Sequence, residues 1–100
     1  MTTPVIFRKV LADNSIIAFF PTNPGSSFPF SVMSYQHIGQ HASAGKTFYE
    51  SMTITAKPDE YKDLQEELIS LGYNDLKIYQ NWYYWMDKER WNRLGKIYGD

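Results

Sequence analysis

Two strand-like segments joined by a short polar link are the feature that most limits how this chain can fold. Residues 5–11 (VIFRKVL) and 15–20 (SIIAFF) are rich in β-branched and aromatic side chains, and Asp13 and Asn14 lie between them. Two such runs around so short a link predict an antiparallel hairpin. The rest of the chain must then supply the other strands of a sheet and the elements that pack on it.

The middle of the chain gives weaker strand signals around a proline-rich stretch. Residues 21–29 (PTNPGSSFP) predict a loop, because proline supplies no donor to a strand ladder. Phe28 and Phe30 flank its last proline, and we expect them to hold this loop against the core. A third strand is predicted over residues 31–35 and a fourth over residues 47–55 (TFYESMTIT), where apolar residues alternate.

The second half of the chain contains two helical patterns separated by a strand pattern. A helix is predicted from Lys57 to Gly72, because proline suits the first turn and glycine commonly ends a helix. Residues 74–80 predict a strand, and Asn81 precedes a second helix that reaches about Ile97. The predicted buried stripe of the first helix is Tyr61, Leu64, Leu68 and Leu71, with Lys62, Glu66 and Glu67 on its polar face. The stripe of the second is Tyr83, Met86, Arg90, Leu94 and Ile97.

The order of these elements predicts the fold class. It reads β-β-β-β-α-β-α, which is typical of an α+β domain with an antiparallel sheet and two helices packed on one face. A length of 100 residues without an internal repeat or a linker predicts a single domain over residues 1–100.

Composition excludes several classes of protein. The chain has no cysteine, which excludes disulfides and thiolate metal sites and fits a reducing compartment. No apolar run reaches the roughly 18 residues that a membrane span needs, and no secretory signal is present, so we expect a cytoplasmic protein without a membrane partner. The net charge of −1 argues against a protein that coats nucleic acid. No motif predicts a cofactor.

A polar segment at residues 35–45 (YQHIGQHASAG) contains both histidines. Histidines four residues apart share one face of a helix and can bind zinc there. Gly39 weakens any helix, however, and no spacing supplies a third ligand, so we expect no metal site. We predict a loop in which these histidines and glutamines satisfy backbone groups. The residues of this candidate polar site are Tyr35, Gln36, His37, Gln40 and His41.

The C-terminal segment interleaves aromatic and basic residues. Trp, Tyr and Arg are the residues favoured at the centres of protein interfaces. The same composition can stack bases and neutralise phosphate, and it can also be plain core. A single helix cannot bury so many large rings on one side, so we expect some to be exposed. The candidate partner-binding residues are Trp82, Tyr84, Trp85, Arg90, Trp91 and Arg93.

Four segments together carry a resemblance to a known group of proteins. They are VIFRK, SIIAFFP, MSYQHIGQH and PDEYKDLQEELISLGY, and the third is the most specific. In these segments the chain resembles a family of small uncharacterised bacterial proteins often found on phages and other mobile elements. The resemblance covers most of residues 5–79 and carries no activity. It implies an accessory protein that acts on a host or rival system, for example as an inhibitor.

The function predicted from these observations is that of a small, non-enzymatic protein that binds another protein. The alternative is a nucleic-acid-binding module that uses the aromatic and basic C-terminal helix. A third interpretation is a histidine-based metal site or enzyme at His37 and His41. Self-association through the aromatic residues is a further outcome that the sequence leaves open.

Overall fold

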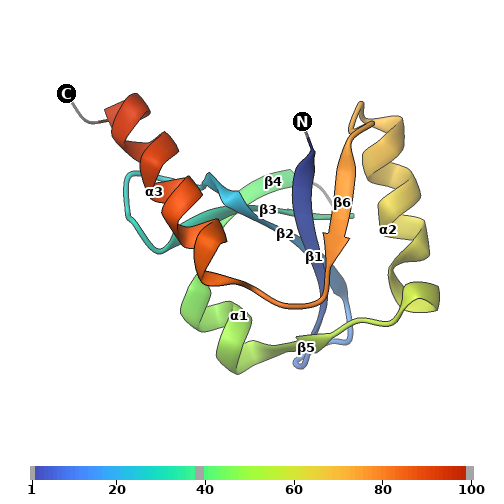
Figure 1. Ribbon diagram of the computed structural model, residues 1–100. Helices are drawn as coiled ribbons and strands as arrows, with labels where there is room; N and C mark the ends of the chain where they lie inside the picture. The colour runs from blue at the N-terminus through green and yellow to red at the C-terminus, as the bar shows by residue number, and fades with distance from the viewer. Residues whose placement is uncertain (1, 38–39, 99–100) are drawn as a thin grey trace.

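The computed structural model describes residues 2–37 and 40–98 and confirms the α+β class (Figure 1). Within these residues a six-stranded sheet runs in the order β4-β3-β2-β1-β5, and β6 also pairs with β1. None of the described helices is both long and apolar enough to cross a membrane. The elements are β1 (Thr3–Val10), β2 (Ile16–Pro24), β3 (Ser31–Gln36), β4 (Gln40–Gly45), α1 (Lys46–Met52), β5 (Thr53–Thr55), α2 (Pro58–Ser70), β6 (Leu76–Tyr79) and α3 (Tyr84–Tyr98).

The predicted hairpin is β1 and β2. The two strands pair antiparallel, with Ile6 opposite Phe19. Asn14 adopts the left-handed conformation (φ 61°), and the Asp13 carboxylate accepts hydrogen bonds from the backbone N–H and the hydroxyl of Ser15. Such Asx contacts are the usual way in which Asp and Asn stabilise a turn.

The sheet extends further than the sequence predicted. β2 continues through residues 21–24, part of the predicted loop, with a register shift against β3 between Phe20 and Pro24. The second difference is β4, which forms a hairpin with β3 where a loop was expected. Its sequence, QHASAG, lacks the apolar alternation of a buried strand because it lies at the edge of the sheet.

The prediction of a strand over residues 47–55 is wrong for most of that segment. Residues 46–52 form α1, and only the last three residues pair with β1, as β5. Phe48 and Met52 fit a helical spacing as well as an alternating one, and Tyr49 joins them on a helix, because positions three and four apart share a helix face. Tyr49 is buried and makes an edge-to-face contact with Phe19, with ring centroids 5.3 Å apart.

The helix that follows matches its prediction more closely. α2 begins at Pro58, and the backbone N–H of Lys57 donates to the Glu60 side chain at 2.9 Å. Leu64 and Leu68 are buried, whereas Leu71, expected in the buried stripe, lies beyond the last turn and is exposed. Gly72 takes the positive φ (113°) that ends many helices.

Helices cover both faces of the sheet, which corrects the expectation that they share one face. α2 packs on the face formed by Val5, Phe7 and Phe20, while residues of α1 and α3 pack on the face formed by Ile6 and Phe19. Figure 1 shows α2 on one side of β1 and α1 and α3 on the other. The physical reason is visible in the sequence, since uninterrupted apolar runs are typical of strands buried on both faces.

Candidate functional site

The aromatic C-terminal segment divides between core and surface. Trp82 lies just before α3 and packs on Tyr49 and Phe19 at centroid distances of 4.9 and 6.4 Å. Its indole N–H donates to the Asp87 carboxylate at 2.8 Å. Trp82 therefore packs against the core on the α1 and α3 side of the sheet, although the sequence placed it among the partner-binding residues.

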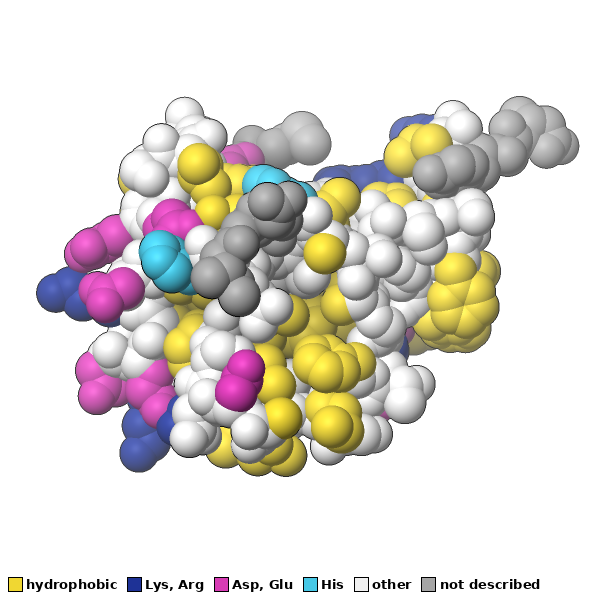
Figure 2. All heavy atoms as spheres, turned by 180° about the vertical axis from the view of Figure 1, so that it is seen from behind, with side chains coloured by type: hydrophobic (Ala, Val, Ile, Leu, Met, Phe, Trp, Pro, Cys, Tyr) yellow, Lys and Arg dark blue, Asp and Glu magenta, His cyan; other side chains and the backbone are white. Residues whose placement is uncertain are grey.

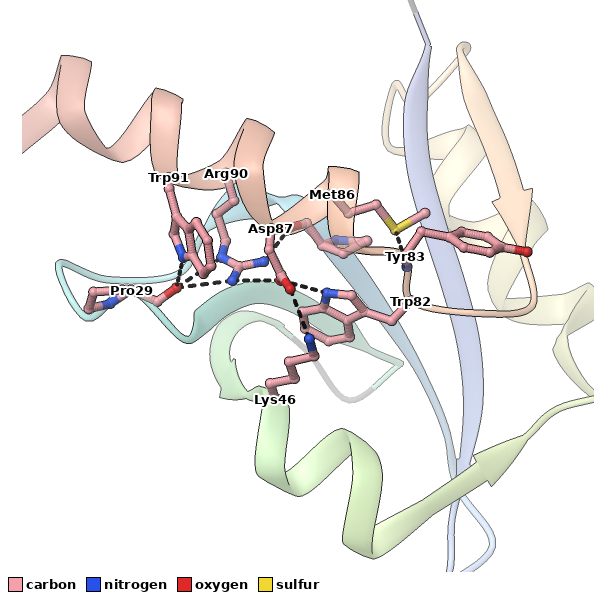
Figure 3. Close-up of polar contacts among 9 residues, drawn as sticks. Pro29, Lys46, Trp82, Tyr83, Met86, Asp87, Arg90 and Trp91 are labelled. Carbon is pink, nitrogen blue, oxygen red and sulfur yellow. Dashed lines mark hydrogen bonds and ion pairs between the residues drawn. The ribbon is translucent and has the colours of Figure 1, made fainter.

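Arg90 is completely buried, which differs from its expected place on a binding surface. Its guanidinium donates to the backbone oxygen of Pro21 at 2.8 Å and to that of Pro29 at 3.0 Å (Figure 3). Pro21 lies where the register shift takes β2 out of its ladder with β3. Arg90 thus donates a hydrogen bond to a buried carbonyl that has no partner in the register with β3. The guanidinium therefore has a structural role.

Asp87 lies at the centre of the polar network beneath α3. Its carboxylate accepts from Lys46 and from Trp82 and forms an ion pair with Arg90 at 2.9 Å (Figure 3). Burial by itself raises the pKa of Asp87, but the hydrogen bonds from these three side chains outweigh burial and hold the pKa below its usual value. The network joins α3 to the start of α1 and to the end of β2.

A continuous group of rings remains exposed beside this network. We call Phe28, Phe30, Tyr84 and Trp91 the aromatic surface. Tyr84 is 67% exposed, Phe28 59% and Phe30 49%. Phe30 contacts both Phe28 and Trp91, with centroids 5.6 and 6.2 Å apart, and Tyr84 contacts Trp91 at 6.2 Å. The two Phe residues, expected to hold their loop on the core, instead extend the exposed aromatic group of α3.

Hydrogen bonds to the Pro29 oxygen hold the aromatic surface in position. The indole N–H of Trp91 donates to the Pro29 oxygen at 2.8 Å, the same oxygen that Arg90 contacts (Figure 3). Trp85 is 43% exposed but belongs to a separate ring contact, with Tyr79 at 5.7 Å. Because Pro29 lies between Phe28 and Phe30, these hydrogen bonds position the exposed rings relative to α3.

The two arginines of α3 are occupied by contacts within the protein. Arg93 donates to the Asn23 side chain at 2.5 Å and to Glu89 at 3.3 Å. Arg90 is buried, as described above. Lys88 lies 5.9 Å from the centre of the Tyr84 ring, at the border of the aromatic surface. Arg90 and Arg93 are therefore engaged within the protein, whereas Lys88 and Lys96 are exposed.

The candidate polar site lies at the other end of the sheet. Glu67, predicted to be on the solvated face of α2, accepts from the Tyr35 hydroxyl and pairs with His37 Nδ1, each at 2.5 Å. The hydrogen bond from Tyr35, followed by that from His37, holds the pKa of Glu67 below its usual value. The same hydrogen bond to Glu67, together with burial, raises the pKa of Tyr35.

The two histidines do not converge on a shared site. His41 Nε2 hydrogen bonds the Tyr73 hydroxyl at 2.7 Å, whereas His37 contacts α2. Gln36 donates to the Ser15 hydroxyl at 3.4 Å, and Gln40 is the first residue of β4. These contacts are to side chains, not to the backbone groups that the sequence suggested. Across residues 2–37 and 40–98 no group of three metal-ligating side chains comes together.

An acidic cleft of about 550 Å³ opens between α2 and the ends of β2 and β3. Glu60 pairs with Lys9, and Asp13 is held by Ser15; both contacts lower the pKa of the respective carboxyl group. The Glu60 and Asp13 carboxylates therefore stay ionised at neutral pH, and Ile16 and Leu64 supply apolar lining. The lining residues are Asp13, Ser15, Ile16, Gln36, His37, Glu60, Asp63, Leu64 and Glu67.

Sequence patterns alone did not identify Asp87, Lys46, Glu67 or Tyr73 as partners in these networks. Several of the contacts join positions 30 or more residues apart, as between His37 and Glu67 or Lys46 and Asp87, although Asp87 also contacts its near neighbours Trp82 and Arg90. The burial of Arg90 did have a local signal in the sequence, because Arg90 follows Met86 by four residues in the predicted buried stripe of α3.

Comparisons with known proteins give no relative from which a function could be transferred. No protein-family model matches the chain, and neither the curated proteins nor the solved structures include a significant match. The resemblance to small mobile-element proteins thus stays a prediction.

Proposed function

We propose that this chain is a small, non-enzymatic binding domain that docks on another protein through the aromatic surface. The observation that carries the proposal is the contact of four partly or largely exposed rings, one of which, Trp91, is hydrogen bonded to the buried network. Clustered exposed aromatic residues usually mark an interface, and a rigid ring loses little conformational entropy on binding.

The surroundings of this surface suggest the chemistry of the partner. Lys88 is exposed and borders the Tyr84 ring. A partner with an apolar depression and an acidic rim fits this arrangement. If the resemblance to mobile-element proteins holds, the partner is a host or defence protein of the cytoplasm.

Nucleic-acid binding is the alternative, and the arrangement supports it less. Arg90 is buried and Arg93 is engaged by Asn23 and Glu89, which leaves Lys88 and Lys96 as the exposed cations of α3. A histidine-based enzyme has less support still, because His37 and His41 contact different partners.

The test is a binding measurement with partner captured from the source cell and then purified. Tyr84→Ala and Phe28→Ala should each weaken the affinity, by roughly 30-fold where the ring is a hot spot, and leave the unfolding midpoint unchanged. Ile97→Ala is the matched control, since Ile97 is similarly exposed on the same helix but lies outside the aromatic surface. Equal affinity for all variants would reject the proposal, and a steep loss of binding with salt would favour nucleic acid.

A further inference from the structure

The two edges of the sheet differ in how they are protected. One edge is made of β5 and β6, which are three and four residues long, and β6 contains Lys77. Short strands and lysine are common means by which proteins prevent pairing at an edge. The other edge is β4, six residues long with the sequence QHASAG, and it contains no Lys, Arg, Asp, Glu or Pro.

The register between β3 and β4 shows which backbone groups of β4 are occupied. Lys46 N donates to Phe30 O at 3.1 Å. Residues 30 and 46 continue the register in which Val32 lies opposite Ala44. Directly opposed residues of an antiparallel ladder alternate between bonded and non-bonded pairs. Since residues 30 and 46 are a bonded pair, the even-numbered residues of β4 direct their N–H and C=O groups at β3.

The odd-numbered residues of β4 therefore direct their backbone groups away from the sheet. These residues are His41, Ser43 and Gly45, and the Gly45 C=O also begins α1, of which Gly45 is the N-cap. Among the residues that the structure describes, no further strand pairs with this side of β4. The edge thus offers a regular row of donors and acceptors with small side chains around it.

The surface around this edge has little charge. Figure 2 shows this side of the molecule, where the two histidines in cyan mark the end of β3 and the start of β4. Acidic side chains gather on the α2 side, whereas the broad region on the opposite side of the histidines is mostly uncharged. Ala42 and Ser43 of β4 are exposed.

We propose that β4 pairs antiparallel with β4 of a second copy of this chain, around a two-fold axis at Ser43. In this register Ser43 lies opposite its own equivalent, and His41 lies opposite Gly45 of the second copy. The N–H and C=O of Ser43 are then paired, as are Gly45 N and His41 O, and the two His41 side chains are not directly opposed. A two-fold interface requires a strand that complements itself, and an uncharged edge satisfies this without like-charge repulsion.

This interface is separate from the aromatic surface and does not depend on the proposed function. It would join two sheets into one continuous sheet and leave Tyr84 and Phe28 free for a different partner. Strand addition by an unrelated protein is the competing occupant, and the experiment distinguishes the two.

Sedimentation velocity of the purified chain and two variants at Ser43 tests the proposal. Ser43→Pro removes an N–H that points outward, so it leaves the ladder with β3 in place. Ser43→Lys places two like charges on opposite sides of the axis. We expect wild type to form a dimer at about 100 μM and both variants to weaken it at least tenfold, the change that about 1.4 kcal/mol produces. Ser51→Lys, an equal change on the exposed side of α1, should leave the dimer intact.

Amide hydrogen exchange supplies a second measurement. The amides of Ser43 and Gly45 should become protected as concentration rises, whereas those of Ala42 and Ala44 should be protected at every concentration. A wild-type chain that stays monomeric at about 1 mM, or a dimer that survives Ser43→Lys, would overturn the proposal. Because Ser43→Lys changes only an exposed side chain, the test holds even if Ser43→Pro does not fold.

Discussion

Arg90 and Asp87, one helical turn apart on α3, form an ion pair of 2.9 Å in which both side chains are buried. Lys46 and Trp82 complete the hydrogen bonding of the carboxylate. A buried pair is costly to break, because the partner left behind keeps its charge without compensation. α3 therefore rests on a polar network and not only on apolar contacts.

Asp87→Asn should lower the free energy of unfolding at pH 7 by about 3 kcal/mol or more, because it leaves Arg90 without its counter-ion. Asp63→Asn, an exposed change on α2, should remain within roughly 0.5 kcal/mol. Urea denaturation measures both. Equal values would mean that the network contributes no more than an exposed residue does.

The same pair predicts a pH dependence. The pKa of Asp87 in the folded chain lies below its usual value of 3.8, so its stabilisation is complete above that pH and is lost as pH falls through the folded pKa. The difference in stability between wild type and Asp87→Asn should therefore shrink below pH 3.8. Denaturation curves from pH 2 to pH 7 check this, and a constant difference over that range would contradict it.

Thr22 and Thr53 are both buried but differ in their hydrogen bonds. Within the described residues the Thr22 hydroxyl has no partner, whereas that of Thr53 donates to Tyr49 O at 2.6 Å and accepts from Arg8. Thr22→Val should therefore be neutral or stabilise by about 1 kcal/mol, and Thr53→Val should destabilise by about 1–3 kcal/mol. Thermal unfolding of the two variants gives the comparison.

Leu68 tests the placement of α2. It is fully buried, so Leu68→Ala should cost about 2–5 kcal/mol. Glu66 is the proper surface control, because Glu67 hydrogen bonds Tyr35 and pairs with His37. Similar losses for Leu68→Ala and Glu66→Ala in chemical denaturation would show that α2 packs with a different face inward.

Tyr35→Phe should raise the pKa of Glu67 toward its usual value, because the Tyr35 hydroxyl is the main cause of the lowered pKa. Carboxyl NMR titration follows this group directly, with Glu66 as an internal reference. An unchanged titration of Glu67 would show that this hydrogen bond does not persist in solution.

The elements that sequence patterns predicted well are those with local causes. The hairpin of β1 and β2 follows from two apolar runs around Asp13 and Asn14, and α2 follows from Pro58, a spaced apolar stripe and Gly72. β4 could not be recognised in this way, because an edge strand needs no apolar alternation. α1 was misassigned because the apolar residues of TFYESM fit both periods.

The candidate sites depended more on contacts between distant segments. The sequence identified the aromatic C-terminal segment, and Tyr84 and Trp85 are indeed exposed. It could not show that Arg90 is buried, because the carbonyl oxygens that accept its hydrogen bonds belong to Pro21 and Pro29, at least 61 residues away. The link of Phe28 and Phe30 to Trp91 has the same non-local origin.

The parallel pairing of β6 with β1 has a consequence for how the chain folds. Thr3 donates to the Asp75 backbone at 2.7 Å and to its side chain across 72 positions of sequence. During synthesis β1 can pair early with β2, but its contacts with β6 must wait until residue 79 has left the ribosome. Closing so large a loop is entropically costly, so folding on the millisecond-to-second scale is expected, with residues 3–6 of the β1 edge open until β6 docks.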